Sequence, residues 1–489
     1  MMTGEQYKQS LRDGRAVYMN GELVDDVTSH PLLKSAVDRV ARGYDKHYQA
    51  GEDAFGPYFS IPTTPEALRE EAIRKSSLDG PTNTTSSSLL MLLSASSKMR
   101  ATHPEYSDRA IGYLERARAA DTRCVQTITD AKGHRALPPS QQDDPDLYLR
   151  IVERRSDGIV INGAKIHISH AVISHDLLVM PTKRMKPDEG DWSVACVVPV
   201  NAPGVTIVNV SFAPRPDIDE RFFPFSSSHP RTEGFVIFDH VFVPWDDVFL
   251  AGEYEHSATF AHSLGLWERA ASLGHYVDVA DTLVGLAQLI SEANGTDKIS
   301  HIKEKIGEMI LYASMLRASY EATLADVSYT PEGWASPSEL HATAGKYYGS
   351  ANFSAMVRHL HDIAGGGVLT SPTLLDLEHE VTGPYLSKYM RTMPGVSAQL
   401  RLRLFHAIRD FTADAFGGFQ HVTILQQGGG LFAQQIVTKK HFNMTNAKNL
   451  GLQTAGVIGW DESVPDCHLS DLEGQLERTK RPVETEATA

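Results

Sequence analysis

The sequence predicts a multidomain α+β protein in which a helical region, an all-β module and a second helical region follow one another. Apolar residues recur with helical periodicity up to about residue 140 and again from about residue 256. Between these limits, short apolar runs punctuated by Pro and Gly replace that periodicity, which is typical of β-strands. A chain of 489 residues is long enough for two or three such domains.

Residues 1–140 are predicted to form an N-terminal helical domain. Amphipathic helices are expected at 5–11, 34–48 and 65–75. Thr64 followed by Pro65 has the composition of a helix start, with Thr as the N-cap. Residues 82–98, TNTTSSSLLMLLSASSK, begin with polar residues and then turn apolar, which predicts a capped and buried helix.

Residues 141–255 are predicted to form the β module. Strands are expected at 148–153, 158–161, 177–181, 192–198, 204–210 and 234–243. The segment 157–182, DGIVINGAKIHISHAVISHDLLVMPT, alternates apolar and polar residues, which indicates a strand with one buried face. Asn162-Gly163 interrupts this run and predicts a two-residue hairpin turn, because both residues tolerate positive φ.

Hydrogen-bonding side chains are unusually dense beyond that turn. They are Lys165, His167, Ser169, His170, Ser174 and His175. A purely structural strand would carry Thr, Lys or Glu on its solvated face. We therefore expect the polar face of this strand to meet a ligand, with an exposed strand edge as the alternative.

Residues 256–460 are predicted to form a C-terminal helical bundle. Long helices are expected at 258–292, 297–326, 337–365 and 396–416. The tail, residues 461–489, is polar and charged, so we expect most of it to pack loosely.

Charge and cysteine content exclude several classes of protein. The formal net charge of −15 argues against binding to nucleic acid or to an anionic membrane, since both need clustered positive charge. Cys124, Cys196 and Cys467 lie far apart, which argues against a disulfide framework and against a metal site. No secretory signal and no apolar run of membrane-spanning length is seen, so a cytoplasmic protein is expected.

Three polar or glycine-rich segments are candidates for ligand contact. They are 130–135 (DAKGHR), 361–367 (HDIAGGG) and 426–430 (QQGGG). Lys132, His134 and Arg135 could donate to a phosphate or an anionic ring, with a solvated turn as the alternative. The glycine triplets suggest backbone packed against a ligand or a neighbouring subunit. Glu268 and His275 lie about two turns apart on one predicted helix and could share a face, either at a site or as an interior polar pair.

Four stretches of the chain resemble a family of flavoenzymes. They are 130–165, 238–244 (FDHVFVP), 300–305 (SHIKEK) and 362–366 (DIAGG). Together they are similar to the family of 4-hydroxyphenylacetate 3-monooxygenase and 4-hydroxybutyryl-CoA dehydratase, over roughly residues 3 to 455. The resemblance implies an acyl-CoA-dehydrogenase-like architecture: an N-terminal helical domain, a central β-barrel and a C-terminal helical bundle. It also implies assembly into a homotetramer or homodimer.

The resemblance further implies FAD, held between the β domain and the bundle. The residues expected to contact it are Lys132, Gly133, His134, Arg135, Ser169, Gln427, Gly428, Gly429 and Gly430. Pro181 and Thr182 stand where the monooxygenases line their substrate pocket. Trp267 and His275 stand near cluster-ligand positions of the dehydratase and are expected near the substrate. The cysteines that would hold an iron–sulfur cluster have no counterpart here, so no cluster is expected.

The resemblance also suggests catalytic residues. The family's Arg-x-Pro-Asp-Tyr motif corresponds to residues 102–106, THPEY, so Tyr106 and the nearby Arg100 are expected to orient the substrate. Gln126 replaces the histidine that contacts the substrate phenol; it can donate a hydrogen bond but cannot exchange a proton. His134 or His170 could supply a titrating group.

The function implied is that of a two-component monooxygenase. Reduced FAD from a separate reductase and O2 would hydroxylate an aromatic or other electron-rich small molecule. A first alternative is a cluster-free, flavin-dependent CoA-ester dehydratase, isomerase or dehydrogenase. A second is a non-catalytic homologue that serves as a scaffold or ligand-binding protein.

Overall fold

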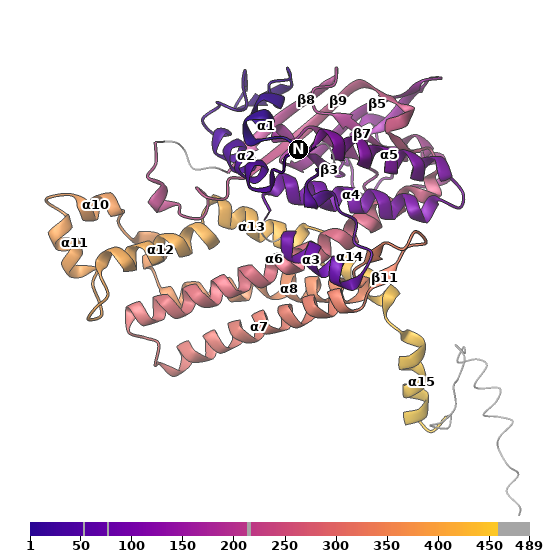
Figure 1. Cartoon of the computed structure of the whole chain (residues 1–489). Coiled ribbons are helices and arrows are strands. Elements are labelled where there is room, and N and C mark those ends of the chain that lie inside the picture. The colour runs from indigo at the N-terminus through magenta and orange to yellow at the C-terminus, as the bar shows by residue number, and fades with distance from the viewer. Residues whose placement is uncertain (52–53, 76–77, 213–216, 458–489) are drawn as a thin grey trace, which may run out of the picture.

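The computed structural model of the chain describes residues 1–51, 54–75, 78–212 and 217–457. Two β-sheets lie at one side of the molecule, and the helical bundle lies beneath them (Figure 1). The predicted tail, 461–489, and Cys467 fall outside the described residues. None of the described helices has the length and apolar character needed to cross a lipid bilayer.

Both of these sheets are open. The larger has strand order β2-β1-β8-β9-β5-β4 and the smaller β10-β7-β6-β3; β1 with β8 and β3 with β6 are the parallel pairs. The strands are β1 (Ala16–Met19), β2 (Glu22–Leu23), β3 (Cys124–Thr127), β4 (Arg150–Arg154), β5 (Gly158–Ser169), β6 (Asp176–Val179), β7 (Val194–Pro199), β8 (Val205–Ser211), β9 (Thr232–Pro244) and β10 (Val248–Ala251). A separate hairpin joins β11 (Ser328–Tyr329) to β12 (Ala335–Ser336). The described strands form no closed barrel, so the expected β-barrel is not confirmed.

The predicted hairpin at Asn162-Gly163 is wrong, because β5 continues through both residues. The pairing of β5 with β9 shifts register between Ile161 and Gly163, which is the mark of a bulge. A Cβ on Gly163, whose φ is +130°, would lie 2.7 Å from the Cα of Leu149. Glycine is therefore needed here for a bulge with close backbone approach, and not for a chain reversal.

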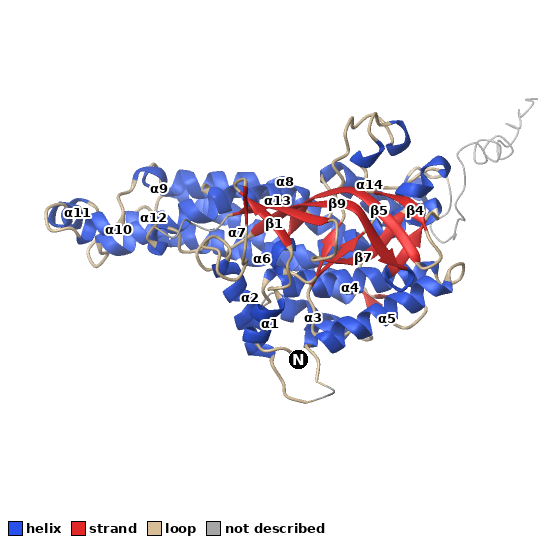
Figure 2. Ribbon diagram, turned by 90° about the horizontal axis from the view of Figure 1, so that it is seen from above, coloured by secondary structure: helices blue, strands red, loops and turns tan. Residues whose placement is uncertain are grey.

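Helices surround the smaller sheet and build the bundle. The N-terminal helices are α1 (Gly4–Ser10), α2 (Lys34–His47), α3 (Pro65–Lys75), α4 (Gly80–Met99) and α5 (Pro104–Ala120). The long bundle helices are α6 (Ser257–Asn294), α7 (Ser300–Ala325) and α8 (Glu339–Ala364). The shorter ones are α9 (Gly367–Thr370), α10 (Leu374–Glu378), α11 (Gly383–Tyr389), α12 (Ala398–Thr412), α13 (Ala415–Gln426), α14 (Leu431–His441) and α15 (Met444–Thr454). Figure 2 shows α9 to α12 extending away from the sheets at one end of the bundle.

The smaller sheet is buried on both faces. Leu177 and Val179 of β6 join the core between the two sheets, whereas Leu178 joins the core shared with α4 and α5. This alternation follows from the period of two along a strand. A third core lies within the bundle. Helix α4, the buried helix that the sequence predicts, begins at the N-cap Asp79 and contacts both β3 and α6.

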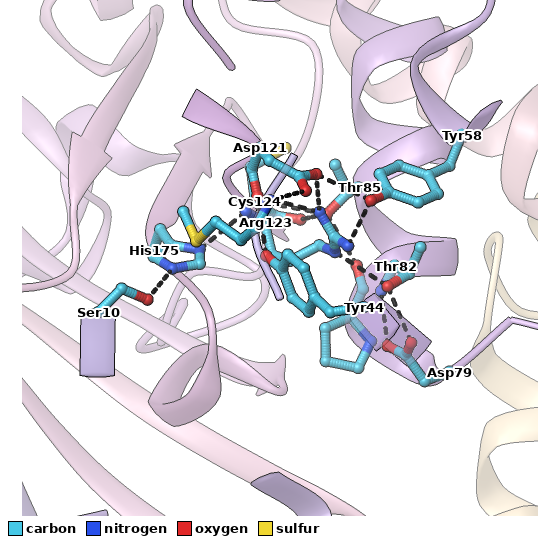
Figure 3. A network of polar contacts seen from close by, with 12 residues as sticks. Ser10, Tyr44, Tyr58, Asp79, Thr82, Thr85, Asp121, Arg123, Cys124 and His175 are labelled. Carbon is cyan, nitrogen blue, oxygen red and sulfur yellow. Dashed lines mark hydrogen bonds and ion pairs between the residues drawn. The ribbon is translucent and has the colours of Figure 1, made fainter. Parts of the chain in front are cut away.

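Arg123 ties the N-terminal helices to the smaller sheet (Figure 3). Its buried guanidinium lies over the rings of Tyr44 and Tyr58, 3.9 and 4.2 Å from their centroids. It donates to Asp121 Oδ1 (3.0 Å), Thr82 Oγ1 (2.9 Å) and Tyr58 Oη (2.7 Å). The network fixes β3 against α2 and α4, and β3 in turn carries Gln126.

Candidate active site

One face of α6 is directed toward the sheets. Glu268, Ser272 and His275 are spaced by four and three residues, so they share a side of the helix. Glu268 contacts β3 through Gln126, and His275 lies close enough to Arg231 for that cation to lower its pKa. This face of α6 therefore faces the sheets and contacts β3 through Glu268.

Glu268 joins β3 to the end of α13. Gln126 Nε2 donates to Glu268 Oε1 at 2.7 Å, and Gln427 Nε2 donates to Oε2 at 2.6 Å. Gln126 belongs to β3, and Gln427 follows the last turn of α13. The structure thus brings together two predicted site residues through a carboxylate.

Ser272 and His275 continue the same side of α6 beyond Glu268. Ser272 is 3% exposed, and its hydroxyl has no hydrogen-bond partner in the described part of the chain. The side chain of His275 is accessible, yet burial by the surrounding protein lowers its pKa to about 4, helped by the Arg231 cation.

Ser169 pairs with Glu233 in the larger sheet. The two residues are direct neighbours on β5 and β9, and Ser169 Oγ donates to Glu233 Oε1 at 2.8 Å. Burial raises the pKa of Glu233 to about 7, although the Ser169 hydrogen bond and the Arg231 cation both lower it. Glu233 is therefore poised to gain or lose a proton near neutral pH.

His170 is buried beside Arg231. Arg231 Nη1 lies 3.2 Å from His170 Nε2, and since a guanidinium only donates, Nε2 must accept. Burial, with Arg231 and Arg39, lowers the pKa of His170 to about 3, so the ring is neutral and carries its proton on Nδ1. That Nδ1 has no partner among the described residues. The neutral histidine thus offers one unused N–H donor.

The basic turn 130–135 lies beside β5. Lys132 and Gly133 both have positive φ, +73° and +48°. Burial lowers the pKa of Lys132, and the cations of Lys132 and Arg135 help to lower the pKa of His167. His134 is exposed, and its backbone exchanges hydrogen bonds with the side chain of Gln142. The turn therefore collects positive charge on the sheet side.

Thr182 and Lys165 are held by structural contacts. Lys165 Nζ lies 2.7 Å from Asp130 Oδ1 and donates to the carbonyls of Ile128 and Met180, each at 2.9 Å. Thr182 Oγ1 bonds to Asp130 and donates to the Ile128 carbonyl at 2.7 Å. Pro181, between Met180 and Thr182, is buried. These bonds join the ends of β3 and β6 to β5.

The second glycine triplet forms a tight turn after α13. Gly428 and Gly429 have φ of +68° and +97°, which glycine adopts without strain. Arg269 Nε donates to the Gly428 carbonyl at 2.9 Å, and a Cβ on Gly428 would lie 2.9 Å from Arg269 Cγ. The first triplet has its own structural reason, since a Cβ on Gly367 would meet the ring of Phe405 at 2.5 Å.

Arg100 lies far from His170, Tyr106 is engaged with Glu253, and Trp267, although next to Glu268, directs its indole toward α4. Gly80, at the start of α4, packs against His170, whereas Arg100 is the C-cap of the same helix. A helix of 20 residues is roughly 30 Å long, so Arg100 and His170 lie at opposite ends. Tyr106 donates to Glu253 at 2.9 Å, and Trp267 Nε1 donates to Ser94 of α4 at 2.9 Å.

Glu233 and Arg231 were not anticipated as site residues from the sequence. Two charged residues directly before the apolar run 234–243 were the available signal. Only the pairing of β9 with β5 shows that they face Ser169 and His170.

The described residues hold no group of three or more His, Cys, Asp or Glu side chains that could bind a metal ion. Cys124 and Cys196 are buried free thiols. Burial, with the Asp176 charge, raises the pKa of Cys124 to about 12, which keeps it protonated.

Comparison with known proteins gives consistent similarities. The model "4-hydroxyphenylacetate 3-hydroxylase N terminal" matches residues 3–250, and its C-terminal counterpart matches residues 257–456. The 4-hydroxybutyryl-CoA dehydratase/vinylacetyl-CoA-Delta-isomerase of Clostridium aminobutyricum is 28% identical, over 94% of this chain and 100% of that protein. The FADH(2)-dependent monooxygenase TftD of Burkholderia cepacia is 26% identical, over 94% of this chain and 93% of that protein.

A solved structure shares the fold. It is the oxygenase component of 4-hydroxyphenylacetate 3-monooxygenase complexed with FAD, with a TM-score of 0.84 and 22% identity over 93% of this chain and 99% of that chain. At that identity, the likeness establishes the fold alone.

Proposed function

The chain belongs to the 4-hydroxyphenylacetate 3-hydroxylase family, and from this premise we propose that it is the oxygenase component of a two-component flavin monooxygenase. It would use reduced FAD, delivered by a separate reductase, and O2 to hydroxylate an aromatic or other electron-rich small molecule. The relatives support a flavin-dependent enzyme, and the polar pairs of Glu268 with Gln126 and of Glu233 with Ser169 support a site where the bundle faces the sheets.

The observation that carries the proposal is the pairing of Ser169 with Glu233 beside the neutral His170. A flavin ring is flat and rich in nitrogen and oxygen acceptors. The unpartnered Nδ1–H of His170 and the unpartnered hydroxyl of Ser272 are buried donors that such a ring would satisfy. The residues present therefore fit the group.

The residues proposed to hold FAD come from the sheet region and from the bundle. They are Lys132, Gly133, His134, Arg135, Ser169 and the segment Gln427, Gly428, Gly429 and Gly430. Lys132 and Arg135 would bind the phosphates, because they supply positive charge next to β5. Bound reduced FAD would supply the electrons that activate O2.

The chain's own groups would manage protons and water. Glu233 can hold a proton on its carboxyl near pH 7 and return it to a neighbouring oxygen, with Ser169 orienting it. His170 stays neutral and donates without titrating in this range. Enclosure between sheets and bundle would exclude bulk water from the reaction.

Substrate contacts are proposed for Gln126, Pro181, Thr182 and His275. Arg100 and Tyr106, at the other end of α4, are proposed to orient the outer part of the substrate. The indole of Trp267, engaged with Ser94, would act by shaping the wall.

A reduced-flavin experiment tests this function. Anaerobic titration of the protein with FADH2 should give saturable, reversible binding, and mixing with O2 and a panel of phenols should give a hydroxylated product. Ser169→Ala should weaken FADH2 binding about tenfold, whereas Ser328→Ala, on the exposed hairpin strand β11, should not. Release of all reducing equivalents as peroxide, with no product across a broad panel, would contradict the proposal.

A second candidate is a flavin-dependent CoA-ester dehydratase, isomerase or dehydrogenase. It is favoured by Glu233, a carboxyl with a pKa of about 7 that could take a proton from carbon, and by the 28% identical dehydratase relative. Oxidised FAD that stays bound through purification, together with binding of CoA esters, would favour this candidate over the oxygenase.

A further inference from the structure

We infer that the substrate presents an uncharged or cationic hydrogen-bond donor to α6, and that the carboxylate of Glu268 excludes anionic groups from this position. The inference rests on the proposed function and narrows its substrate class. It assigns to Glu268 a selective role that differs from the proton handling proposed for Glu233.

The contacts of Glu268 hold its carboxylate in place between α6, β3 and the end of α13. Each carboxylate oxygen accepts one amide N–H, from Gln126 at 2.7 Å and from Gln427 at 2.6 Å. Two donors from two different elements hold the group in one orientation. A carboxylate can accept about four hydrogen bonds, so acceptor capacity remains for a ligand.

No cation on α6 neutralises this charge. Arg269, the next residue, donates to the Gly428 carbonyl, and its Nη1 lies 3.6 Å from Glu339. His275, two turns along the same face, is neutral at physiological pH. Arg231, Lys132 and Arg135 belong to the sheet side, where the flavin is proposed to lie.

Ser272 supplies an independent sign of a ligand at this face. Ser272 is only 3% exposed, and its Oγ has no hydrogen-bond partner among the described residues. It lies one turn from Glu268, so one substrate group could donate to the carboxylate while the hydroxyl meets an adjacent polar atom. In a site poor in water, a phenolate or carboxylate in that place would be repelled strongly.

Four ligands that differ at one end test the inference. They are 4-methylphenol, 4-methylaniline, 4-methylbenzylamine and 4-methylbenzoate, which present two neutral donors, a cation and an anion on the same ring. Binding is measured at pH 7.5 from the change in the absorbance spectrum of the FAD-loaded protein. We expect the anion to bind at least tenfold more weakly than the other three.

Glu268→Gln should abolish that discrimination, by improving binding of 4-methylbenzoate about tenfold relative to 4-methylphenol. Glu292→Gln, on the same helix and hydrogen-bonded to Gln288, is the matched control and should leave the order unchanged. Equal or tighter binding of the anion by the unaltered protein overturns the inference, and this result needs no variant to fold. Failure to bind FAD at all would instead overturn the proposed function.

Discussion

Arg123 has its guanidinium wholly inside the protein, where it balances the buried Asp121. Arg123→Met would leave that carboxylate without a cation and would empty the space between the rings of Tyr44 and Tyr58. Loss of one partner of a buried pair typically costs about 3–5 kcal/mol. We expect a fall of that size in the free energy of unfolding by urea. Arg154→Met, which removes an exposed pair with Asp191, should change it by less than about 1 kcal/mol.

Glu233 should give the protein a distinctive pH dependence. Its pKa is raised from 4.5 to about 7, so the folded state keeps a proton that the unfolded chain releases. Its contribution to stability is therefore complete below pH 4.5 and is lost as the pH rises to 7. Glu233→Gln has no such proton to lose. Relative to the unaltered protein, its free energy of unfolding should be higher at pH 8 than at pH 5, by up to about 3 kcal/mol.

Unfolding by urea at the two pH values measures this difference. Glu22→Gln, on the exposed strand β2, should show no such change between them. A constant difference between Glu233→Gln and the unaltered protein at both pH values would refute the assignment.

Single residues show where sequence reasoning succeeds and where it ends. Ser169 and Gln126 were chosen through a resemblance, and each has a buried or half-buried carboxyl partner, Glu233 and Glu268 respectively. Their site roles stay predictions. Glu233 could not be chosen, because its chemistry depends on burial and on a strand neighbour distant in sequence.

At the scale of elements, the turn after α13 controls the position of Gln427. Gly428→Ala would place a side chain at φ +68° and against Arg269, at a cost of about 1–3 kcal/mol. Gly418→Ala, inside α13 with open space around its Cα, should instead stabilise by about 0.5–1 kcal/mol. Thermal unfolding compares the two. Gly428→Ala should also weaken FADH2 binding. Equal changes in thermal stability from the two substitutions would contradict this account.

The positions of many elements were predictable because their patterns are local. Helices expected at 34–48 and 65–75 are confirmed as α2 and α3, and the long runs of the third region are confirmed as α6, α7 and α8. The strand β3 lies in a region read as helical, because four residues are too few to show a period. The hairpin failed because Asn-Gly chemistry serves a bulge as well as a turn.

At the scale of the whole molecule, apolar side chains remain exposed on the bundle. Leu311 and Met315 of α7 are 65% and 52% exposed, and Tyr385 and Tyr389 of α11 are 63% and 69% exposed. Surfaces of this kind commonly mark contacts between chains. We expect a homotetramer or homodimer, with a mass in light scattering that is a multiple of 53.8 kDa.

Leu311→Glu combined with Met315→Glu should shift this mass toward that of one chain. Lys303→Glu combined with Glu304→Lys, charged and on the same helix, is the control that should leave it unchanged. A monomeric mass for the unaltered protein would contradict the expectation.

The order of helical, β and helical regions was visible in the sequence, whereas the contacts between the bundle and the sheets were not. Periodicity cannot dictate how distant segments such as β3, α6 and the end of α13 meet. The resemblance supplied the expectation of a flavin between sheets and bundle; the contacts of Glu268 with Gln126 and Gln427 emerge only from packing.

The parallel pairing of β1 with β8 has a consequence for biosynthesis. Ala16 leaves the ribosome early, yet its partner Thr206 is translated much later. β2 can pair with one edge of β1 at once, but the edge that faces β8 must wait until most of the β module has been made. An edge that stays open for so long is a natural target for chaperones, and nascent chains halted before residue 200 should be captured more readily than those halted after residue 260.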